Sequence, residues 1–328
     1  MTATLLLSRA EVARHLPMPA LASAIGDAYI RHSTEPLAPE PQRARAVIGD
    51  GASVVVSFPG GLSGYDCYTV KVNAKTVGNP AIGLPFLRGA VLLIERETGA
   101  LRAIVESSLL TAMRTAAAGA LGVTALARPE ASTVALLGAG VQGTWHLGAL
   151  QATGRLGRVR IHDLVAARAV QLADELSRSL GVDASPADST REACDGADII
   201  IAVTTSRTPI LDRSLVAPGT HVSAFGADEP GKVELAPELV RAATVVVDDR
   251  ALALTDGALN VGARAGDLDG GVIHAELGEV LAGRKRGRTS ADEITIFAAV
   301  GLAWQDLVAA ELCYRAAIAA NAGTWIEF

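Results

Sequence analysis

The chain has 328 residues, of which 50% are hydrophobic and 4% aromatic, and its formal net charge is -6. This length exceeds one ordinary domain and, at roughly 150 residues per domain, indicates two. The acidic balance provides no basic field for a phosphate backbone, so a nucleic-acid partner is not expected.

Cysteine spacing and the N-terminal segment both favour a cytoplasmic protein. Cys67, Cys194 and Cys313 lie far apart, without the close pairs that zinc sites and disulfide frameworks use, so we expect no metal and a reducing compartment. The apolar run before Ser8 is too short for a signal peptide. The longest apolar stretch, residues 109–127, contains an arginine and many alanines, which indicates a packed helix rather than a membrane span.

The first third of the chain predicts two helices and then an antiparallel meander. Ser8 and Glu11 form a capping box that predicts a helix start, and a second helix is expected over residues 20–30. Three prolines make residues 34–43 a connector. Runs rich in β-branched residues then predict strands at 43–49, 52–58, 68–74, 88–96 and 100–106.

From residue 108 the pattern changes to that of a doubly wound parallel sheet. A long helix is predicted over residues 108–128, because alanine and leucine are dense there and proline is absent. Short apolar strands separated by helix-length segments follow at 133–137, 158–163, 198–204, 220–226 and 243–249. The helical run at 301–320 could return to the first domain and complete it.

A glycine motif between a predicted strand and a predicted helix indicates a dinucleotide site. Gly138, Gly140 and Gly143 form G-x-G-x-x-G, which permits a tight turn, close approach to pyrophosphate and close packing of helix on strand. The other members of the predicted cofactor-binding set are Val141 and Gln142 within the motif and Thr204 and Thr205 at the end of the third strand of this half. A glycine-rich turn without a ligand is the alternative.

Asp163, at the end of the next strand, favours NAD(H) over its phosphorylated form. It follows Gly138 by 163 minus 138, or 25, residues, close to the spacing of the carboxylate that binds the adenosine ribose hydroxyls. Arg160 and Arg168 flank it and could instead bind a 2′-phosphate. The alternative for Asp163 is a solvated carboxylate at a strand end with no role in binding.

Several ordered motifs resemble the ornithine cyclodeaminase/mu-crystallin family over nearly the whole chain. They are PQR in the connector, VKVNAKTVGNPAIGLP, AVLLIERETG, TAMRTAAAGA, GAGVQG, GTHVSAFGADEPGKVEL and EITIFAAVGLAWQD. Within the family, GADEPGKVEL and GLAWQDL are most similar to archaeal-type alanine dehydrogenases and to imine and ketimine reductases.

The resemblance implies an α/β fold in which a Rossmann-type parallel sheet is inserted into an α+β substrate-binding and dimerisation domain made from both chain ends. The implied domains are residues 1–112 with 305–328, and residues 113–304. It further implies a homodimer formed through the sheets of the substrate domains and an active site in the cleft between the two domains.

The resemblance also implies roles for charged residues. Lys71, Arg114 and Arg43, with Arg45 as the alternate for the last, match cations that bind the substrate carboxylate, a task suited to a bidentate arginine and a mobile lysine charge. Asp228 matches the acid/base aspartate, and Lys71 belongs with it to the catalytic set. From the residues alone, Lys71 could be a solvated strand position, Arg114 a snorkelling helix residue and Asp228 a turn former.

Four residues depart from the family pattern. Ala298 and Ala299 stand where many relatives have a polar pair, and Glu106 replaces an aspartate. Arg88 stands where relatives carry an uncharged residue. It could recognise a second acidic group of the substrate, or it could simply face outward.

The resemblance, together with the dinucleotide motif, implies an NAD(H)-dependent oxidoreductase that interconverts a small α-amino acid and its α-imino acid, as an imine or ketimine reductase or an alanine dehydrogenase does. One alternative is an ornithine or lysine cyclodeaminase, an ammonia lyase that recycles its NAD internally. A second is a crystallin-like protein that binds a ligand without turnover, against which the retention of Lys71, Arg114 and Asp228 argues.

Overall fold

The structure, a computed structural model, describes residues 3–37, 43–49 and 52–327. Two residues of the PQR motif, Pro41 and Gln42, lie outside the described residues. The chain divides into unit 1, formed by Met1–Arg114 and Leu302–Phe328, and unit 2, formed by Thr115–Gly301. The second unit is thus inserted into the first.

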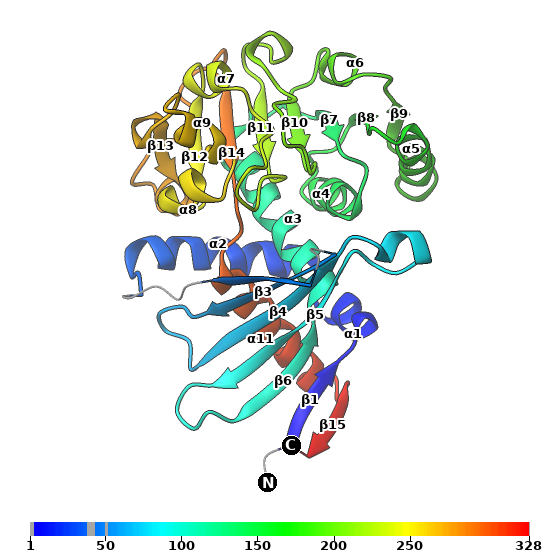
Figure 1. Cartoon of the computed structure of the whole chain (residues 1–328), viewed down its shortest axis with the longest axis vertical. Helices are drawn as coiled ribbons and strands as arrows, with labels where there is room; N and C mark the ends of the chain where they lie inside the picture. Colours follow the sequence, from blue (N-terminus) through cyan, green and yellow to red (C-terminus); the bar gives the residue numbers. More distant parts are fainter. Residues whose placement is uncertain (1–2, 38–42, 50–51, 328) are drawn as a thin grey trace. The chain divides into compact units, whose positions relative to one another are not determined.

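Unit 1 contains a seven-stranded sheet drawn from both ends of the chain (Figure 1). Its strands are β1 (Ala3–Leu7), β2 (Ala44–Ile48), β3 (Ser53–Gly60), β4 (Cys67–Thr76), β5 (Leu87–Glu95), β6 (Leu101–Glu106) and β15 (Thr324–Glu327), in the order β15-β1-β6-β5-β4-β3-β2. The predicted antiparallel meander from β2 to β6 is confirmed. The antiparallel pairing of β15 with β1 was not predicted, because a short C-terminal run gives no signal of its partner.

The α-helices of unit 1 cover one face of this sheet. They are α1 (Arg9–His15), α2 (Met18–Thr34) and α11 (Ala303–Ala319), whereas the short 3-10 helix η1 (Asn79–Ile82) lies in the connection between β4 and β5. The predicted capping box at Ser8 and Glu11 is confirmed. Helix α11 packs on β3, β4 and β5 and against α1 and α2, so the C-terminal segment completes the core of the unit.

Unit 2 is built on an eight-stranded parallel sheet. Its strands are β7 (Thr133–Leu137), β8 (Arg158–His162), β9 (Asp183–Pro186), β10 (Ile199–Ala202), β11 (His221–Ala224), β12 (Thr244–Val247), β13 (Ile273–Glu276) and β14 (Thr295–Ala298), in the order β13-β12-β14-β11-β10-β7-β8-β9. The predicted doubly wound sheet is confirmed. The strand order reverses between β7 and β10, which is where open parallel sheets bind ligands.

Helices flank both faces of the parallel sheet (Figure 1). They are α3 (Ser107–Leu126), α4 (Val141–Ala152), α5 (Ala166–Leu180), α6 (Thr190–Cys194), α7 (Pro237–Arg241), α8 (Arg250–Thr255), α9 (Asn260–Ala265) and α10 (Leu277–Leu281), with 3-10 turns η2 (Arg213–Leu215) and η3 (Gly270–Val272). Among the described helices, α3 alone is long and apolar enough to cross a membrane, and 72% of its most apolar window is buried within the protein.

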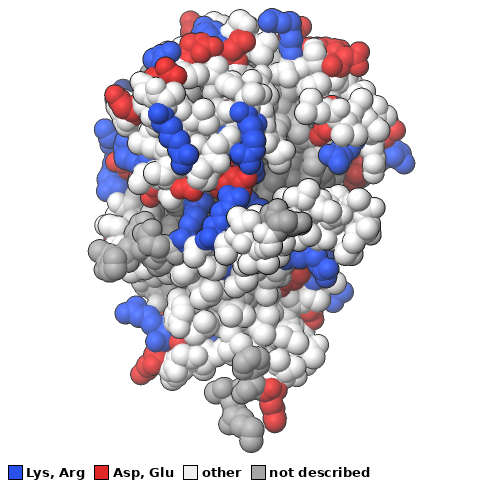
Figure 2. All heavy atoms as spheres, viewed as in Figure 1, with Lys and Arg blue, Asp and Glu red and all other residues white. Residues whose placement is uncertain are grey.

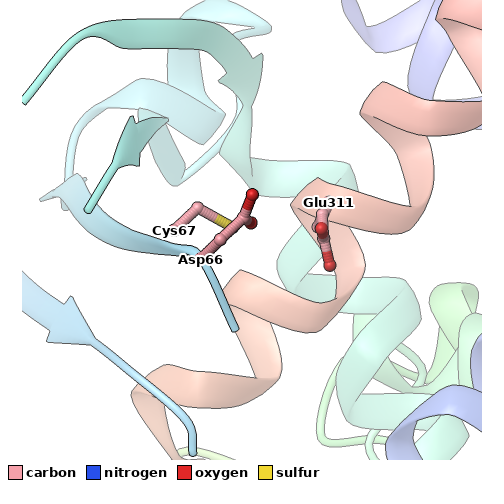
Figure 3. A group of neighbouring side chains, drawn as sticks. All are labelled: Asp66, Cys67 and Glu311. Carbon is pink, nitrogen blue, oxygen red and sulfur yellow. The ribbon is translucent and has the colours of Figure 1, made fainter. Parts of the chain in front are cut away.

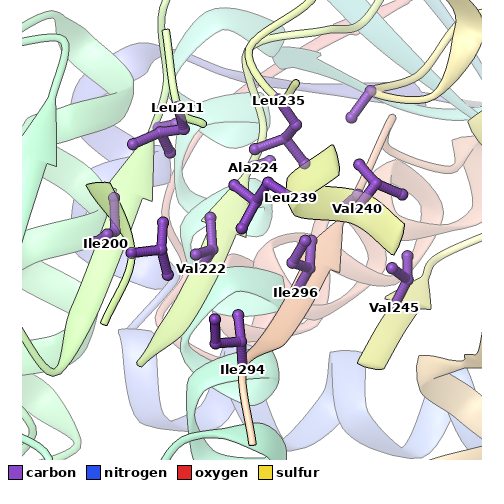
Figure 4. Close-up of a cluster of buried hydrophobic side chains, with 14 of the residues drawn as sticks. Ile200, Leu211, Val222, Ala224, Leu235, Leu239, Val240, Val245, Ile294 and Ile296 are labelled. Atoms are coloured by element: carbon purple, nitrogen blue, oxygen red, sulfur yellow. The ribbon is translucent and has the colours of Figure 1, made fainter. Parts of the chain in front are cut away.

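Alternate residues of the central strands supply the two cores of unit 2. On one face, buried side chains of β10, β11, β14 and β12 pack with those of α7, among them Ile200, Val222, Ile296, Val245 and Leu239 (Figure 4). On the other face, Phe297 of β14 packs against α3 so closely that a Cβ at Gly122 would overlap its ring. Such close packing leaves little room for added volume.

This contact predicts opposite effects for the same substitution in two helices. Gly122→Ala should lower the free energy of unfolding by about 1–3 kcal/mol, because the new methyl group must displace the buried Phe297 ring. Gly148→Ala, in α4, meets no atom within 4 Å and should raise it by up to about 1 kcal/mol through helix propensity. Denaturant unfolding of both variants checks this, and equal effects would show that the packing argument is wrong.

Candidate active site

Two cationic side chains of unit 1 converge on one buried carboxylate. Nζ of Lys71, on β4, lies 2.6 Å from Oδ2 of Asp306, and Nε of Arg114, on α3, lies 3.1 Å from Oδ1 of the same residue. Gln305 accepts a hydrogen bond from Nη1 of Arg114 at 2.6 Å and donates one to the Tyr29 hydroxyl at 2.7 Å. The structure thus brings Lys71 and Arg114 together through Asp306 and Gln305.

Sequence reasoning missed Asp306 and Gln305, although both lie in the GLAWQD motif. The available signal was a polar pair in the first turn of a largely apolar helix, where an uncompensated carboxylate would be costly to bury. Both side chains are buried in α11, so each requires a partner from another element. Lys71 and Arg114 are those partners.

Burial changes the chemistry of the lysine. Lys71 is 1% exposed and Asp306 is fully buried, and removing such charges from water costs several kcal/mol per ion. Desolvation lowers the pKa of Lys71 to about 8. The charge of Asp306 opposes this shift, whereas the positive charges of Arg114 and Arg43 add to it.

An aromatic ring joins the third predicted cation to the group. The Phe58 ring, on β3, has Cζ of Arg43 at 5.1 Å from its centroid and Nζ of Lys71 at 4.5 Å. Each such contact is worth about 0.5–2 kcal/mol, depending on burial. Arg43 and Lys71 therefore lie near each other at this ring, whereas the alternate, Arg45, lies on β2 and is exposed.

Arg88 is not brought to this group within unit 1. Its strand, β5, pairs Val91 with Lys71, so these two side chains share the buried face of the sheet. Side chains alternate along a strand, which turns Arg88, opposite Ala74, to the other face. The proposed role of Arg88 in recognising a second acidic group has no support from this geometry.

In unit 2, the glycine motif forms the expected turn between β7 and α4. Gly138 has φ 104°, and a Cβ there would lie 2.9 Å from the carbonyl oxygen of Val203. A Cβ at Gly143 would overlap the Gly138 carbonyl, and Gly140 is the N-cap of α4. Val141 and Gln142 are the first residues of that helix. The turn leaves room for pyrophosphate at a helix N-terminus, which suits a dinucleotide.

Asp163 supports the same turn from the neighbouring strand. Its Oδ2 accepts a hydrogen bond from the Ala139 amide at 2.8 Å, and its Oδ1 accepts one from Val165 at 2.8 Å. A carboxylate has about four lone-pair sites, so acceptor capacity remains for ribose hydroxyls. Nη1 of Arg160 donates hydrogen bonds to the backbone carbonyls of Glu192 and Asp195 at 3.2 and 2.8 Å, which hold this side chain against the segment 192–195.

The remaining predicted residues follow β10 and β11, next to the point where strand order reverses. Asp228 follows β11, is 37% exposed, and has its Oδ1 2.6 Å from Nζ of Lys232. Thr204 and Thr205 follow β10, and the Thr204 amide and hydroxyl donate to the buried carboxylate of Glu234 at 2.7 and 2.8 Å. Sequence reasoning missed Lys232 and Glu234, although both lie in the GADEPGKVEL motif.

Three described side chains outside these groups lie close enough together to be considered as metal ligands. The ligand atoms of Asp66, Cys67 and Glu311 lie within 4.8 Å of one another (Figure 3). Arg102 binds Asp66 through two hydrogen bonds of 3.1 and 2.9 Å, and Arg315 binds Glu311 at 3.0 Å. Burial raises the pKa of the Cys67 thiol to about 12, which disfavours the thiolate that a metal requires. Ion pairing within the protein accounts for this group.

Charged side chains on the molecular surface are mixed in sign. On the face shown in Figure 2, Lys and Arg side chains lie among Asp and Glu side chains. Recognition of a small anion therefore rests on particular cations, such as Lys71 and Arg114, rather than on a broad positive field on this face.

The chain is similar to known proteins over almost its whole length. The model of the ornithine cyclodeaminase/mu-crystallin family matches residues 2–321. Alanine dehydrogenase of Archaeoglobus fulgidus is 37% identical over 254 residues, which cover 76% of this chain and 77% of that protein.

Two solved structures have the same fold throughout. An archaeal alanine dehydrogenase dimer with bound NAD has a TM-score of 0.91 at 32% identity and covers 100% of both chains. Delta(1)-pyrroline-2-carboxylate reductase of Thermococcus litoralis, in complex with NADH and L-proline, has a TM-score of 0.92 at 31% identity and covers 98% of this chain and 99% of that one.

The low pKa of Lys71 predicts weaker carboxylate binding in alkaline solution. A depressed lysine pKa of about 8 means that the ammonium form is lost as pH rises through that value. The dissociation constant of pyruvate, used as a carboxylate probe with NADH present, should therefore rise above pH 8 by up to about tenfold per pH unit. Calorimetric titrations from about pH 6.5 to about 9.5 measure it.

Lys71→Arg is the control, because a guanidinium keeps its charge across this range. The dissociation constant of pyruvate from this variant should be nearly independent of pH, whatever the absolute affinity. The same alkaline rise in both proteins would assign the effect to another group.

Proposed function

Since the chain belongs to the ornithine cyclodeaminase/mu-crystallin family, we propose that it interconverts a small α-amino acid and its α-imino acid with net turnover of NAD(H). It is an NAD(H)-dependent oxidoreductase, as its relatives with bound NAD and NADH are. The observation that carries the proposal is the convergence of Lys71 and Arg114 on a single carboxylate, with a dinucleotide turn in the same chain.

The cation pair supplies the recognition of an α-carboxylate. Lys71 and Arg114 already share the two oxygens of Asp306, which shows that their spacing suits one carboxylate between them. A guanidinium retains donors after one such contact, and an ammonium has three. Both can therefore hold a substrate carboxylate while Asp306 fixes their positions.

Asp228 supplies the proton chemistry. Oxidation requires a neutral amine, because an ammonium does not readily release hydride, so a carboxylate must remove the proton from the amino group. In the reverse direction the same carboxylate stabilises the iminium cation and returns a proton to its nitrogen. Nζ of Lys232, 2.6 Å from Oδ1 of Asp228, is placed to hold this carboxylate in position.

The cofactor, when bound, accepts or donates the hydride at the substrate α-carbon. Gly138, Gly140 and Gly143 leave space for its pyrophosphate, and Asp163 retains acceptors for its ribose. The residues present thus fit the group on steric and chemical grounds.

The direct test is an assay of the purified protein with NADH and a panel of imino acids. The panel contains cyclic imino acids, and pyruvate, glyoxylate or oxaloacetate with ammonia or methylamine, followed at 340 nm. We expect NADH oxidation with at least one carboxylated imine, and Asp228→Asn should reduce kcat by about 10²–10⁴-fold. Asp174→Asn, at an exposed position of α5, is the control and should keep full activity.

A parallel assay gives the protein NAD with ornithine or lysine and measures ammonia. Ammonia release without accumulation of NADH would identify a cyclodeaminase and contradict net turnover. No reaction in either assay would contradict the enzymatic proposal and favour a ligand-binding role.

We further propose a homodimer formed through the outer face of the unit 1 sheet, the face opposite α11. Register places Tyr68 beside Ile94 and Val72 beside Ala90 on this face, with Tyr68 36% and Val72 42% exposed. An apolar sheet face of this kind is typical of a protein interface. A symmetric second copy would cover it, as the dimeric state of the archaeal relative suggests.

Replacing an apolar residue of this face by a charge tests the dimer. Val72→Asp should convert a dimer into a monomer, because an unpaired carboxylate would be buried at the interface. Light scattering after size exclusion measures the mass. Val170→Asp, on exposed α5, should leave the mass unchanged, and a monomeric wild-type protein would contradict the proposal.

We also propose a cytoplasmic location. All three cysteines are buried and free, which fits a reducing compartment.

A further inference from the structure

Glu234 connects two loops at the carboxyl edge of the parallel sheet. Its side chain is fully buried. Oε1 accepts hydrogen bonds from the amide and the hydroxyl of Thr204 at 2.7 and 2.8 Å, and Oε2 accepts one from the amide of Gly226 at 2.8 Å. One carboxylate thus holds the loop after β10 and the loop after β11.

The contact between the two loops leaves no room for a side chain at Gly226. A Cβ on Gly226 would overlap both the Thr204 carbonyl and Glu234 Oε1, so the two loops approach as closely as glycine allows. Burial raises the pKa of Glu234, and the donors of Thr204 and Gly226 and the charge of Lys232 oppose that shift. Three directed donors make such a buried carboxylate tolerable.

Both loops lead to residues that the proposed reaction uses. The Thr204 methyl carbon lies 3.4 Å from the Cβ position of Gly138, so the first loop borders the glycine turn. The second loop continues from Gly226 to Asp228, whose partner Lys232 precedes Glu234 by two residues in sequence. A shift of either loop would alter the cofactor turn, the acid/base group or both.

We propose that Glu234 is a positioning residue that holds the cofactor-side loop at Thr204 and the Asp228 loop in one fixed arrangement. This inference rests on the proposed function for the role of Asp228, but the effect of Glu234 on cofactor binding can be tested without any substrate. Misplacement of reacting groups by about 1 Å can cost on the order of a hundredfold in rate, so such a residue affects catalysis without touching substrate.

Glu234→Gln is the informative variant because it keeps the shape of the side chain. An amide nitrogen in place of Oε2 would face the Gly226 N–H, and in place of Oε1 it would face both Thr204 donors, so at least one contact is lost in either orientation. Glu238→Gln, an exposed glutamate in the first turn of α7, is the matched control.

Hydrogen–deuterium exchange measures the two loops directly. In Glu234→Gln, amides in the segments 203–206 and 225–228 should exchange faster than in the wild type, with strand β7 unchanged. The dissociation constant of NADH, from fluorescence titration, should rise about tenfold. Unchanged exchange in both segments, or a dissociation constant within about twofold of wild type, would overturn the proposal.

Steady-state kinetics separate positioning from general destabilisation. With a substrate found in the imino acid panel, kcat should fall and KM for NADH should rise, whereas KM for the imino acid should stay within about twofold, because its carboxylate cations lie in unit 1. Equal increases in both KM values, with faster exchange throughout unit 2, would show a merely structural role.

Thr204→Val supplies a second variant if Glu234→Gln does not fold. It removes the hydroxyl donor and keeps the amide, so NADH binding should weaken in the same direction by a smaller factor, and no weakening would overturn the proposal. If the panel gives no turnover while Glu234→Gln still weakens NADH binding, the proposed reaction fails and the loop connection stands.

Discussion

The ion contacts of Asp306 constrain how unit 1 can be assembled. A buried carboxylate without partners would cost several kcal/mol, and Lys71 and Arg114 each face the same penalty alone. Their mutual contacts offset it only when β4, α3 and the start of α11 meet at one point. These elements come from both ends of the chain, so the C-terminal helix has to return to the first strands before the cations can be buried. The same geometry leaves both cations with donors for an anionic ligand, which links assembly of the unit to its proposed chemistry.

Unit 2 uses carboxylates in a different way, as acceptors for backbone amides. Asp163 joins the β8 edge to the β7 turn, Glu234 joins the loops after β10 and β11, and Asp248 accepts from the amides of Val300 and Gly301, joining the β12 edge to the segment after β14. Each contact connects neighbouring strands at their carboxyl ends. Between β7 and β10, where the strand order reverses, Gly138 instead approaches the Val203 carbonyl directly. The carboxylates therefore brace the loops on either side of the position where a dinucleotide pyrophosphate is expected.

Local patterns in the sequence predicted most of the fold, because periodicity and caps are local properties. The meander, the capping box at Ser8 and the first strands of the parallel sheet were all identified from runs of neighbouring residues. Strands β9, β13, β14 and β15 were not among the predicted strands. Strands β14 and β15 pair with strands far away in sequence, which a local run of residues does not reveal. The site divides in the same way. The glycine turn has a fixed local spacing and could be recognised in the sequence. The roles of Asp306 and Glu234 depend on residues far away in sequence. That Arg88 and Lys71 lie on opposite faces of the sheet follows only from the strand register.

Charge balance in unit 1 connects binding to protonation. Three cations, Lys71, Arg114 and Arg43, lie near one carboxylate, Asp306, and desolvation together with the two arginines lowers the pKa of Lys71 to about 8. A bound substrate carboxylate would act on Lys71 as Asp306 does, favouring the ammonium form. By linkage, carboxylate binding above about pH 8 is then accompanied by proton uptake at Lys71. Asp306 consequently has two opposing effects, since it keeps the lysine charged enough to attract an anion and cancels part of the charge that attracts it. Among the described residues that act on Lys71, the arginines outnumber this carboxylate, and a substrate carboxylate could neutralise the excess positive charge.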